Sequence, residues 1–378
     1  MTDPLAAPPP SALPLAPAPP SNVKFPLGWL LEHASPPLRY RALAEVAQFD
    51  DAAAKAEWLP LSYVPAIELM LEQTHDGLWN HAMLSIPSSR ATAFEGVGTI
   101  QAIRRLLEYG WNKDSPPLML ARRTLFRLLA EDDDPAYLFE LGGKARPDIE
   151  IAQFGRQILR EAAAATLAQA GYIDDPRLRG AARRILDRIA DFMASPFGEK
   201  PWIRVGNKQV LAAEAAPPSI YTLHMLAHMP LVRTENHAVV EAIYEWITRP
   251  LPRQEAVQLV GRKLVDVPHL VLGDQLPHRN ALEDDVPAGI AWLELLARLG
   301  FLKRQEQWVK MFERLLDDRD RNGVWHPHKG SANPKSNNPY VWSTYPLERP
   351  KEGEERWADV TFRLGLIARL AGRTIDLV

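Results

Sequence analysis

The chain of 378 residues contains no cysteine. This absence excludes structural disulfides, thiolate zinc sites and cysteine nucleophiles. It is consistent with a reducing compartment, so we expect a cytoplasmic protein. Long apolar runs are also missing, since none approaches the roughly 20 residues that a membrane-spanning helix needs. We therefore predict no transmembrane segment.

The chain also lacks an excess of charge of one sign, because its formal net charge is only −3. No general basic field exists to attract nucleic acid or acidic lipid. The pairs Arg104-Arg105 and Arg183-Arg184 are isolated, so we predict no nucleic-acid partner. Walker and Rossmann glycine patterns are absent as well, and the sequence names no cofactor.

The N-terminal segment is rich in proline and alanine and reads MTDPLAAPPPSALPLAPAPPSN over residues 1–22. It lacks the basic start of a signal peptide and is interrupted by proline. Such chain favours extended polyproline conformations and has little to bury. We predict a disordered tail over residues 1–24 and a single domain over residues 25–378. A docking arm for a partner is the alternative interpretation of the tail.

A short pattern recurs along the chain: leucine, then glycine four residues on, then an aromatic residue. It reads LLEYGW at 106–111, LAQAGY at 167–172 and LARLGF at 296–301. Glycine suits the left-handed position that ends a helix, and the aromatic residue can fold back onto the last turn. Each copy therefore predicts the end of one helix and a second helix soon after it.

The spacing of these glycines indicates a repeat of about 60 residues. Gly110 and Gly171 are 61 residues apart, and Gly300 follows after 129, about two units. The missing junction falls near residue 235, after a helix that Pro230 stops. The first helices of the units are predicted at 37–48, 92–109, 153–170, 219–229, 285–299 and 357–371. The second helices are predicted at 61–73, 116–130, 176–192, 236–247 and 304–316.

The two sets of helices differ in polarity. The helix over 176–192 is amphipathic, with Arg183, Arg184, Asp187 and Arg188 on its polar face, as suits an outer ring. The first helices are apolar around most of their circumference, as suits an inner ring. Since no stretch shows sustained strand alternation, a central sheet is not expected. The pattern predicts an all-α fold, an α/α toroid of about five to six helical hairpins.

Two tryptophan motifs carry a family resemblance. Gln73-Thr-His-Asp-Gly-Leu-Trp79 has the form Q-x-x-D-G-x-W, and a degenerate copy lies at Asp320-Arg-Asn-Gly-Val-Trp325. They resemble the QW repeat of terpenoid cyclases and protein prenyltransferases. The opening segments Trp29–Glu32 and Pro36–Tyr40 also look like uncharacterised bacterial proteins of squalene-cyclase-like type. The resemblance implies an α/α toroid with a central cavity for a hydrophobic molecule such as an isoprenoid.

Two features of these families are missing from the chain. The acid motif D-x-D-D of class II terpene cyclases does not occur, and the nearest run, Glu131–Asp134, reads as a solvated acidic turn. Protein prenyltransferases bind zinc with a cysteine ligand, which this chain cannot supply.

Candidate catalytic residues lie at the starts of the first helices, which converge on one rim of a toroid. Glu283, Asp284 and Asp285 precede the helix at 285–299 and could act as general acid or cation stabiliser. The alternative is that Asp284 or Asp285 caps the helix. His224 lies four residues from a second histidine, with Tyr221 one turn earlier, and could transfer protons or serve a structural role.

A polar rim loop near 326–356 supplies aromatic groups that could stack on a sugar or shelter a carbocation. The alternative is a surface excursion whose tryptophans are anchored in the core. The substrate-binding residues predicted from this loop and from the first turns of the inner helices are Glu95, Arg156, His228, Trp325, His326, Tyr340, Trp342 and Asp359.

Three functions remain open at this stage. The first is an enzyme that acts on a hydrophobic small molecule in the cavity by acid-assisted chemistry. The second is a carbohydrate-active hydrolase or lyase, which needs two carboxylates and stacking aromatics at a groove. The third is a binding or scaffold protein without catalysis. Peripheral contact with a membrane is a further open expectation, and no metal ligand set is predicted.

Overall fold

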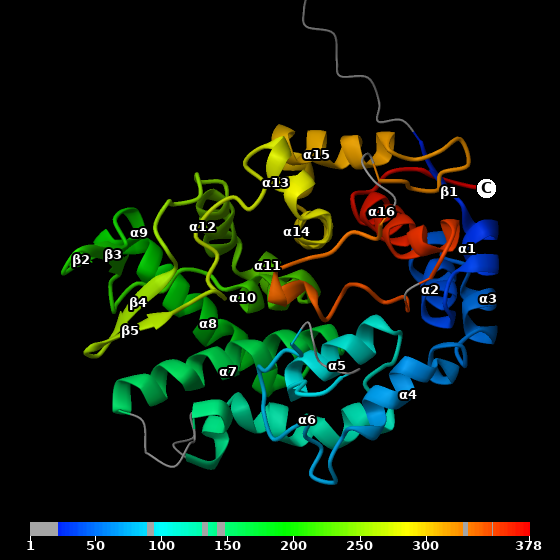
Figure 1. Cartoon of the computed structure of the whole chain (residues 1–378). Coiled ribbons are helices and arrows are strands. Elements are labelled where there is room, and N and C mark those ends of the chain that lie inside the picture. Colours follow the sequence, from blue (N-terminus) through cyan, green and yellow to red (C-terminus); the bar gives the residue numbers. More distant parts are fainter. Residues whose placement is uncertain (1–21, 89–93, 131–134, 142–147, 328–331, 350) are drawn as a thin grey trace, which may run out of the picture.

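The computed structural model describes residues 22–88, 94–130, 135–141, 148–327, 332–349 and 351–378 (Figure 1). The predictions for residues 1–21 of the tail and for the acidic run Glu131–Asp134 lie outside the described residues.

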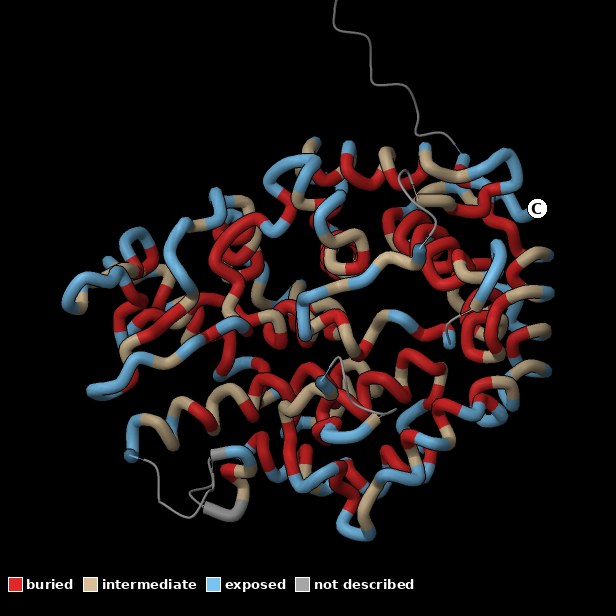
Figure 2. The backbone as a smooth tube through the Cα atoms, in the orientation of Figure 1, coloured by how far each residue is buried: buried red, intermediate tan, exposed pale blue. Residues whose placement is uncertain are grey.

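Six central helices carry most of the buried surface. They are α2 (Pro36–Arg41) with its continuation η1 (Ala42–Ala47), α5 (Thr99–Glu108), α7 (Ile149–Gln169), α10 (Ile220–His228), α14 (Val286–Leu299) and α16 (Ala358–Leu370). Along α16, every residue from Ala358 to Ala368 is buried, charged ones included. Figure 2 shows these helices as the most continuously buried part of the chain. They correspond to the predicted first helices, and the predicted range 285–299 for α14 is one residue from the observed start.

A second set of helices flanks the central ones. It comprises α4 (Val64–Leu71), α6 (Pro116–Leu128), α8 (Pro176–Ala194), α12 (His237–Ile247) and α15 (Glu306–Asp317). In α8, Leu178, Ile185 and Ile189 are buried while Arg183 and Asp187 are exposed, because only one stripe of the helix meets the core. The predicted difference in burial between the two sets is therefore confirmed.

Shorter elements connect these helices. They are α1 (Leu27–His33), α3 (Asp50–Lys55), η2 (Pro60–Ser62), η3 (Pro135–Leu141), α9 (Pro196–Glu199), α11 (Pro230–Glu235), α13 (Arg279–Asp284), η4 (Leu302–Arg304), η5 (Pro339–Val341) and η6 (Glu354–Trp357).

The fold is mostly helical but contains two sheets, so the prediction of an all-α chain is wrong on this point. The strands are β1 (Val23–Phe25) paired with β6 (Ile375–Leu377), and β2 (Trp202–Val205), β3 (Lys208–Leu211), β4 (Val257–Val260) and β5 (Lys263–Asp266) in that order. Gly206 and Gly261 have φ of 61° and 59° and turn the two hairpins of the four-stranded sheet. Strands of three or four residues are too short to show sustained alternation in the sequence.

Strand β1 also corrects the predicted boundary of the tail. Val23 and Lys24 belong to β1, which pairs in parallel with the C-terminal strand β6. Phe25 is buried against α16, where Gly365 leaves room for its ring, since a Cβ at Gly365 would lie 2.3 Å from Phe25 Cδ2. The folded region thus begins before residue 25.

The recurring glycines end their helices as predicted. Gly110, Gly171 and Gly300 have φ of 87°, 90° and 78°. The next residue in each case donates its N–H to the carbonyl of the leucine five positions earlier, as in Trp111 to Leu106 at 3.0 Å. This is the Schellman arrangement, which satisfies carbonyls at the helix end.

The two tryptophan motifs form equivalent turns. Each spans an antiparallel bridge, Gln73 with Trp79 and Arg319 with Trp325. Each tryptophan N–H donates to a threonine at the start of a central helix, at 3.1 Å in both cases: Trp79 to Thr99 of α5, and Trp325 to Thr361 of α16. The motifs therefore connect the end of a flanking helix to the start of the next central helix.

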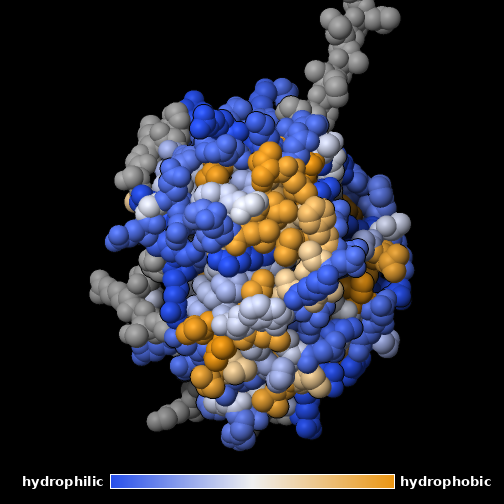
Figure 3. Space-filling model, turned by 90° about the vertical axis from the view of Figure 1, so that its right-hand side faces the viewer, coloured by the Kyte–Doolittle hydropathy of each residue, from blue (hydrophilic) through white to orange (hydrophobic). Residues whose placement is uncertain are grey.

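One face of the molecule exposes large apolar side chains. Phe49, Trp58, Leu61 and Val64, on and around α3 and α4, are all exposed, and Trp58 keeps 61% of its surface accessible. Figure 3 shows a hydrophobic patch on the side of the molecule to which these helices belong. Within the described residues, no helix is long and apolar enough to cross a membrane.

Glycine-to-alanine variants separate backbone strain from crowding. Gly77 and Gly171 have similar φ of 86° and 90°, but a Cβ at Gly77 would lie 2.8 Å from the Leu120 oxygen, whereas one at Gly171 would meet nothing within 4 Å. We expect Gly171→Ala to lower the free energy of unfolding by about 1 kcal/mol through strain alone. Gly77→Ala should lower it by about 2–4 kcal/mol, because overpacking adds to the strain.

Urea unfolding of both variants and the parent chain measures the difference. Equal losses in the two variants would contradict the close approach of the Gly77 turn to α6.

Candidate functional site

A buried network of ion pairs connects the central helices near their C-terminal ends. Glu108 of α5 accepts hydrogen bonds at 2.7 Å from Arg41 of α2 and from Arg363 of α16. Its other oxygen accepts from Gln169 Nε2 of α7 at 3.0 Å. Burial alone would raise the pKa of Glu108, but the two guanidinium groups hold it well below its usual range. Glu108 is thus ionised and contacts three other helices.

The network extends to α14 and η1. Arg363 also binds Glu294 of α14 at 2.7 Å, and Glu294 accepts from Arg298 at 2.8 Å. Glu45 of η1 accepts from Arg41 and lies 3.9 Å from Arg298. Every carboxylate of this network therefore contacts at least one guanidinium, which offsets the cost of burying its charge.

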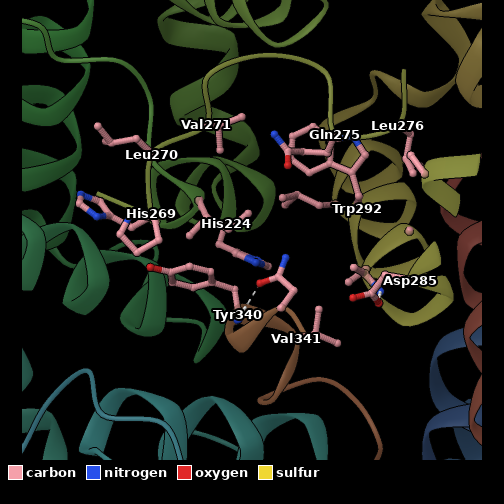
Figure 4. Close-up of a pocket in the computed structure, with 18 residues that line it drawn as sticks. His224, His269, Leu270, Val271, Gln275, Leu276, Asp285, Trp292, Tyr340 and Val341 are labelled. Atoms are coloured by element: carbon pink, nitrogen blue, oxygen red, sulfur yellow. Dashed lines mark hydrogen bonds between the residues drawn. The ribbon is translucent and has the colours of Figure 1, made fainter. Parts of the chain in front are cut away.

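A pocket of about 250 Å³ lies at the opposite, N-terminal ends of α10 and α14 (Figure 4). Its walls are the starts of these two helices, the loop over residues 268–276, and the segment Asn338–Val341. We call it the first pocket. Its lining residues are Ile220, His224, Pro268, His269, Leu270, Val271, Gln275, Leu276, Ala281, Asp285, Ala288, Gly289, Ala291, Trp292, Leu295, Asn338, Tyr340 and Val341.

Two histidines contribute uncharged polar groups to the first pocket. Burial, reinforced by the charge of Arg104, lowers the pKa of His224 well below its usual range. Burial likewise lowers the pKa of His269 to about 4, despite the nearby Glu161. Both imidazoles are therefore neutral at pH 7, each with one donor and one acceptor nitrogen.

Tyr340 and Trp292 supply the aromatic walls of the first pocket. Tyr340 is positioned by its N–H, which donates to Asn338 Oδ1 at 3.0 Å. Its ring packs edge-on against Tyr221 of α10, with centroids 6.0 Å apart. Burial raises the pKa of Tyr340 to about 12, so the hydroxyl keeps its proton. The site therefore combines apolar walls with neutral hydrogen-bonding groups.

Asp285 is the carboxylate of the first pocket, and both of its oxygens are engaged. Oδ1 accepts the N–H of Ala288 at 2.9 Å and caps α14, so the capping alternative considered from the sequence describes this residue. Oδ2 accepts from the Ser336 hydroxyl at 2.9 Å and from the Asn337 N–H at 3.1 Å. Asp285 therefore ties the start of α14 to the segment that covers it.

The other two predicted acids lie elsewhere. Glu283 and Asp284 are exposed and line a second pocket of about 410 Å³, together with Trp325. Glu283 pairs with Arg279 and Arg314, each at 2.7 Å. The structure does not bring the three predicted acids together, because α13 ends between them and the chain turns into α14.

A covering segment over residues 332–349 crosses the central helices between α14 and α5 (Figure 1). Arg105 of α5 donates to the Trp342 carbonyl at 2.7 Å, and Arg363 donates to the Thr344 carbonyl at 2.7 Å. Asp359 of α16 accepts the Leu347 N–H at 2.6 Å. Trp342 and Asp359, both predicted to contact substrate, instead hold this segment in place.

The remaining predicted residues lie outside the first pocket. Tyr221 is buried behind Tyr340, and His228 lies one turn beyond His224 on α10. Glu95 is exposed in the turn before α5.

Two further predicted residues are equally remote from it. Arg156 is half-buried on α7, and the ring of His326 lies 6.2 Å from that of Trp357. Among the described residues, no three histidine, aspartate or glutamate side chains are grouped as metal ligands.

A third hollow lies on the outer surface between α6 and α8 and is lined by arginines, among them Arg122, Arg123 and Arg177. Arg177 is neutralised by Asp175 at 2.8 Å. The first pocket is the better candidate site, because it is the one in which predicted residues from three separate elements (His224, Asp285 and Tyr340) meet.

Sequence reasoning missed His269, Gln275 and Trp292. Trp292 lies on a predicted inner helix, and its place seven residues after Asp285 could have put both on one face. His269 and Gln275 belong to a loop between β5 and α13, and nothing in the sequence pattern indicates where that loop folds.

Comparison with known proteins gives no match: no family model, no curated protein and no solved structure matches this chain.

The pH dependence of stability reports on Asp359. Burial raises its pKa to about 6, although Arg363 opposes the shift. The folded state therefore binds a proton that the unfolded state releases, so this residue makes stability fall as pH rises from about 4 to about 6. Asp359→Asn removes this loss while its Oδ1 can still accept the Leu347 N–H. We expect the variant to be more stable at pH 7.5 by up to about 3 kcal/mol.

Denaturant unfolding between pH 4 and 7.5 measures this effect, with Glu352→Gln, at an exposed position, as the control. A variant less stable than the parent at pH 7.5 would mean that the 3.8 Å ion pair with Arg363 outweighs the burial.

Proposed function

We propose that the chain is an α/α toroid that binds a small, mostly apolar molecule in the first pocket. A circuit of helix contacts supports the toroid: α5 packs against α7, α7 against α10, α10 against α14, α14 against α16, and α16 against α2 and η1. The ion pair between Arg41 and Glu108 joins the two ends of this circuit. The six central helices would form the inner ring, and the flanking helices the outer one.

The observation that carries the binding function is the lining of the first pocket. Aliphatic side chains and two aromatic rings surround polar groups that are neutral at pH 7, namely His224, His269 and Gln275. Pockets with apolar walls and a few fixed polar groups are typical of small-molecule sites. The volume equals that of about eight water molecules, which suits a ligand of medium-chain size.

Acid-assisted chemistry has less support than binding. A general acid must carry a proton that it can give up near neutral pH, and the Asp285 oxygens already accept hydrogen bonds from three groups. His224, whose pKa is strongly lowered, is a weak base. The terpenoid cyclase resemblance therefore contributes the architecture and the apolar ligand to this proposal, and no catalytic step.

The carbohydrate-active alternative has weaker support still. Its acids would be Glu283 and Asp284 in the second pocket, where Trp325 is the aromatic residue. Trp325 is only 1% exposed and packs against Trp357, so its ring offers no free face for a sugar.

Peripheral membrane contact stays a prediction. Its candidate surface is the exposed apolar patch around Trp58 and Val64.

Filling the first pocket tests the proposed function. Ala288 and Ala291 line this pocket, whereas Ala332 lines the second one. In isothermal titration calorimetry with 1-octanol, we expect the parent chain and Ala332→Phe to bind and Ala288→Phe to lose binding, because its ring occupies the space.

Circular dichroism confirms that both variants remain folded. Unchanged octanol binding in folded Ala288→Phe, or loss of binding in Ala332→Phe alone, would refute the proposed site.

A further inference from the structure

Two buried polar residues on α5 have atoms without partners. Gln101 is 0% exposed, and neither its amide oxygen nor its amide nitrogen has a hydrogen-bond partner among the described residues. Arg104, one turn later, is 1% exposed, and its Nη2 also lacks one. Buried polar groups in native proteins are nearly always hydrogen-bonded, so two adjacent exceptions on one helix face require an explanation.

Arg104 is also the guanidinium of the central network that has no carboxylate of its own. Its Nε donates to Gln169 Oε1 at 3.1 Å, which is a neutral amide. Glu45, Glu108 and Glu294 are instead bonded by three other arginines, namely Arg41, Arg298 and Arg363. Four arginines therefore face three glutamates, and one positive charge is left over.

A buried unpaired cation is costly for a protein and is rarely kept without a counter-charge. The neighbouring side chains do not supply one. His224 and Tyr221 are uncharged, and the positive charge of Arg104 favours that state in the imidazole by lowering its pKa. The fourth negative charge of this cluster must therefore come from outside the chain.

The cluster adjoins the first pocket. The Arg104 charge acts on both Tyr221 and His224 of α10. His224 lines the pocket, and Tyr221 packs against Tyr340, which also lines it. Figure 4 shows His224 in the middle of the view, between Tyr340 and Trp292. A ligand lying in the pocket thus has its nearest buried positive charge just beyond His224.

We infer that Arg104 and Gln101 bind the carboxylate of a medium-chain organic acid whose apolar body occupies the first pocket. This inference rests on the proposed binding function and adds the chemical class of the ligand. A guanidinium matches a carboxylate geometrically, and the Gln101 amide adds a donor. One excess positive charge balances a monoanion, so a carboxylate fits better than a doubly charged phosphate.

Calorimetry with a matched pair of ligands tests the inference. Octanoate and 1-octanol share the same chain length and differ in charge. The parent chain should bind octanoate more tightly than octanol, and inorganic phosphate should not compete. In Arg104→Gln, octanoate affinity should fall by about 30-fold or more while octanol affinity stays unchanged. Arg123→Gln, at an exposed position on α6, is the matched control and should bind like the parent.

Thermal stability without ligand distinguishes a binding role from a structural one. If Arg104 and Gln101 wait for a ligand, Arg104→Gln and Gln101→Leu should melt at or above the parent temperature, since each removes an unsatisfied buried group. Melting well below the parent would show that Arg104 is structural and would overturn the inference. Gln101→Leu should also weaken octanoate binding, which keeps the test valid if Arg104→Gln does not fold.

The outcomes separate the two proposals. Octanol binding without any preference for octanoate would overturn the carboxylate assignment and leave the proposed function intact. Binding of neither ligand by the parent chain would remove both.

Discussion

Glu108 is the group on which the centre of the molecule depends. It is a buried carboxylate at the end of α5 that accepts hydrogen bonds from α2, α7 and α16 at once. Through Arg363 and Arg298 the same network reaches α14 and η1. Removing one partner of such a network leaves an uncompensated charge in the interior, which typically costs about 3–5 kcal/mol. The ends of these central helices are therefore fixed relative to one another by charge as well as by apolar packing.

The opposite ends of the central helices are organised differently. There the covering segment over residues 332–349 is held by carbonyl and N–H groups that bond to Arg105, Arg363 and Asp359. Asp285 joins the same segment to the cap of α14. Because this segment supplies Asn338, Tyr340 and Val341 to the first pocket, the pocket exists only when the segment is in place. Arg363 takes part in both the network and the attachment of the segment, so the two ends are coupled through one side chain.

The helices could be predicted from local signals because those signals have local causes. The glycines at 110, 171 and 300 end their helices through left-handed backbone, and the burial of α7 and α14 follows from apolar residues on nearly every side. The strands β2 to β5 could not be predicted so easily, since each has four residues and the two hairpins pair only after α10–α12 have brought them together. Of the candidate site, His224, Asp285 and Tyr340 were identified from sequence and do meet, whereas Glu283 and Asp284 were placed one turn too far from α14 to join them.

The sequence by itself determined where helices start and end, which of them are buried, and that two tryptophan turns are equivalent, because helix caps, periodicity and glycine conformation act within a few residues. Only the tertiary structure decided which charges are paired. Glu108 lies 67 positions from Arg41 and 255 from Arg363 in the chain, and nothing in the sequence marks them as partners. The same holds for Arg104, whose lack of a carboxylate becomes visible only when all neighbouring helices are assembled around it. Long-range electrostatics depend on distance in space, which the order of residues does not encode.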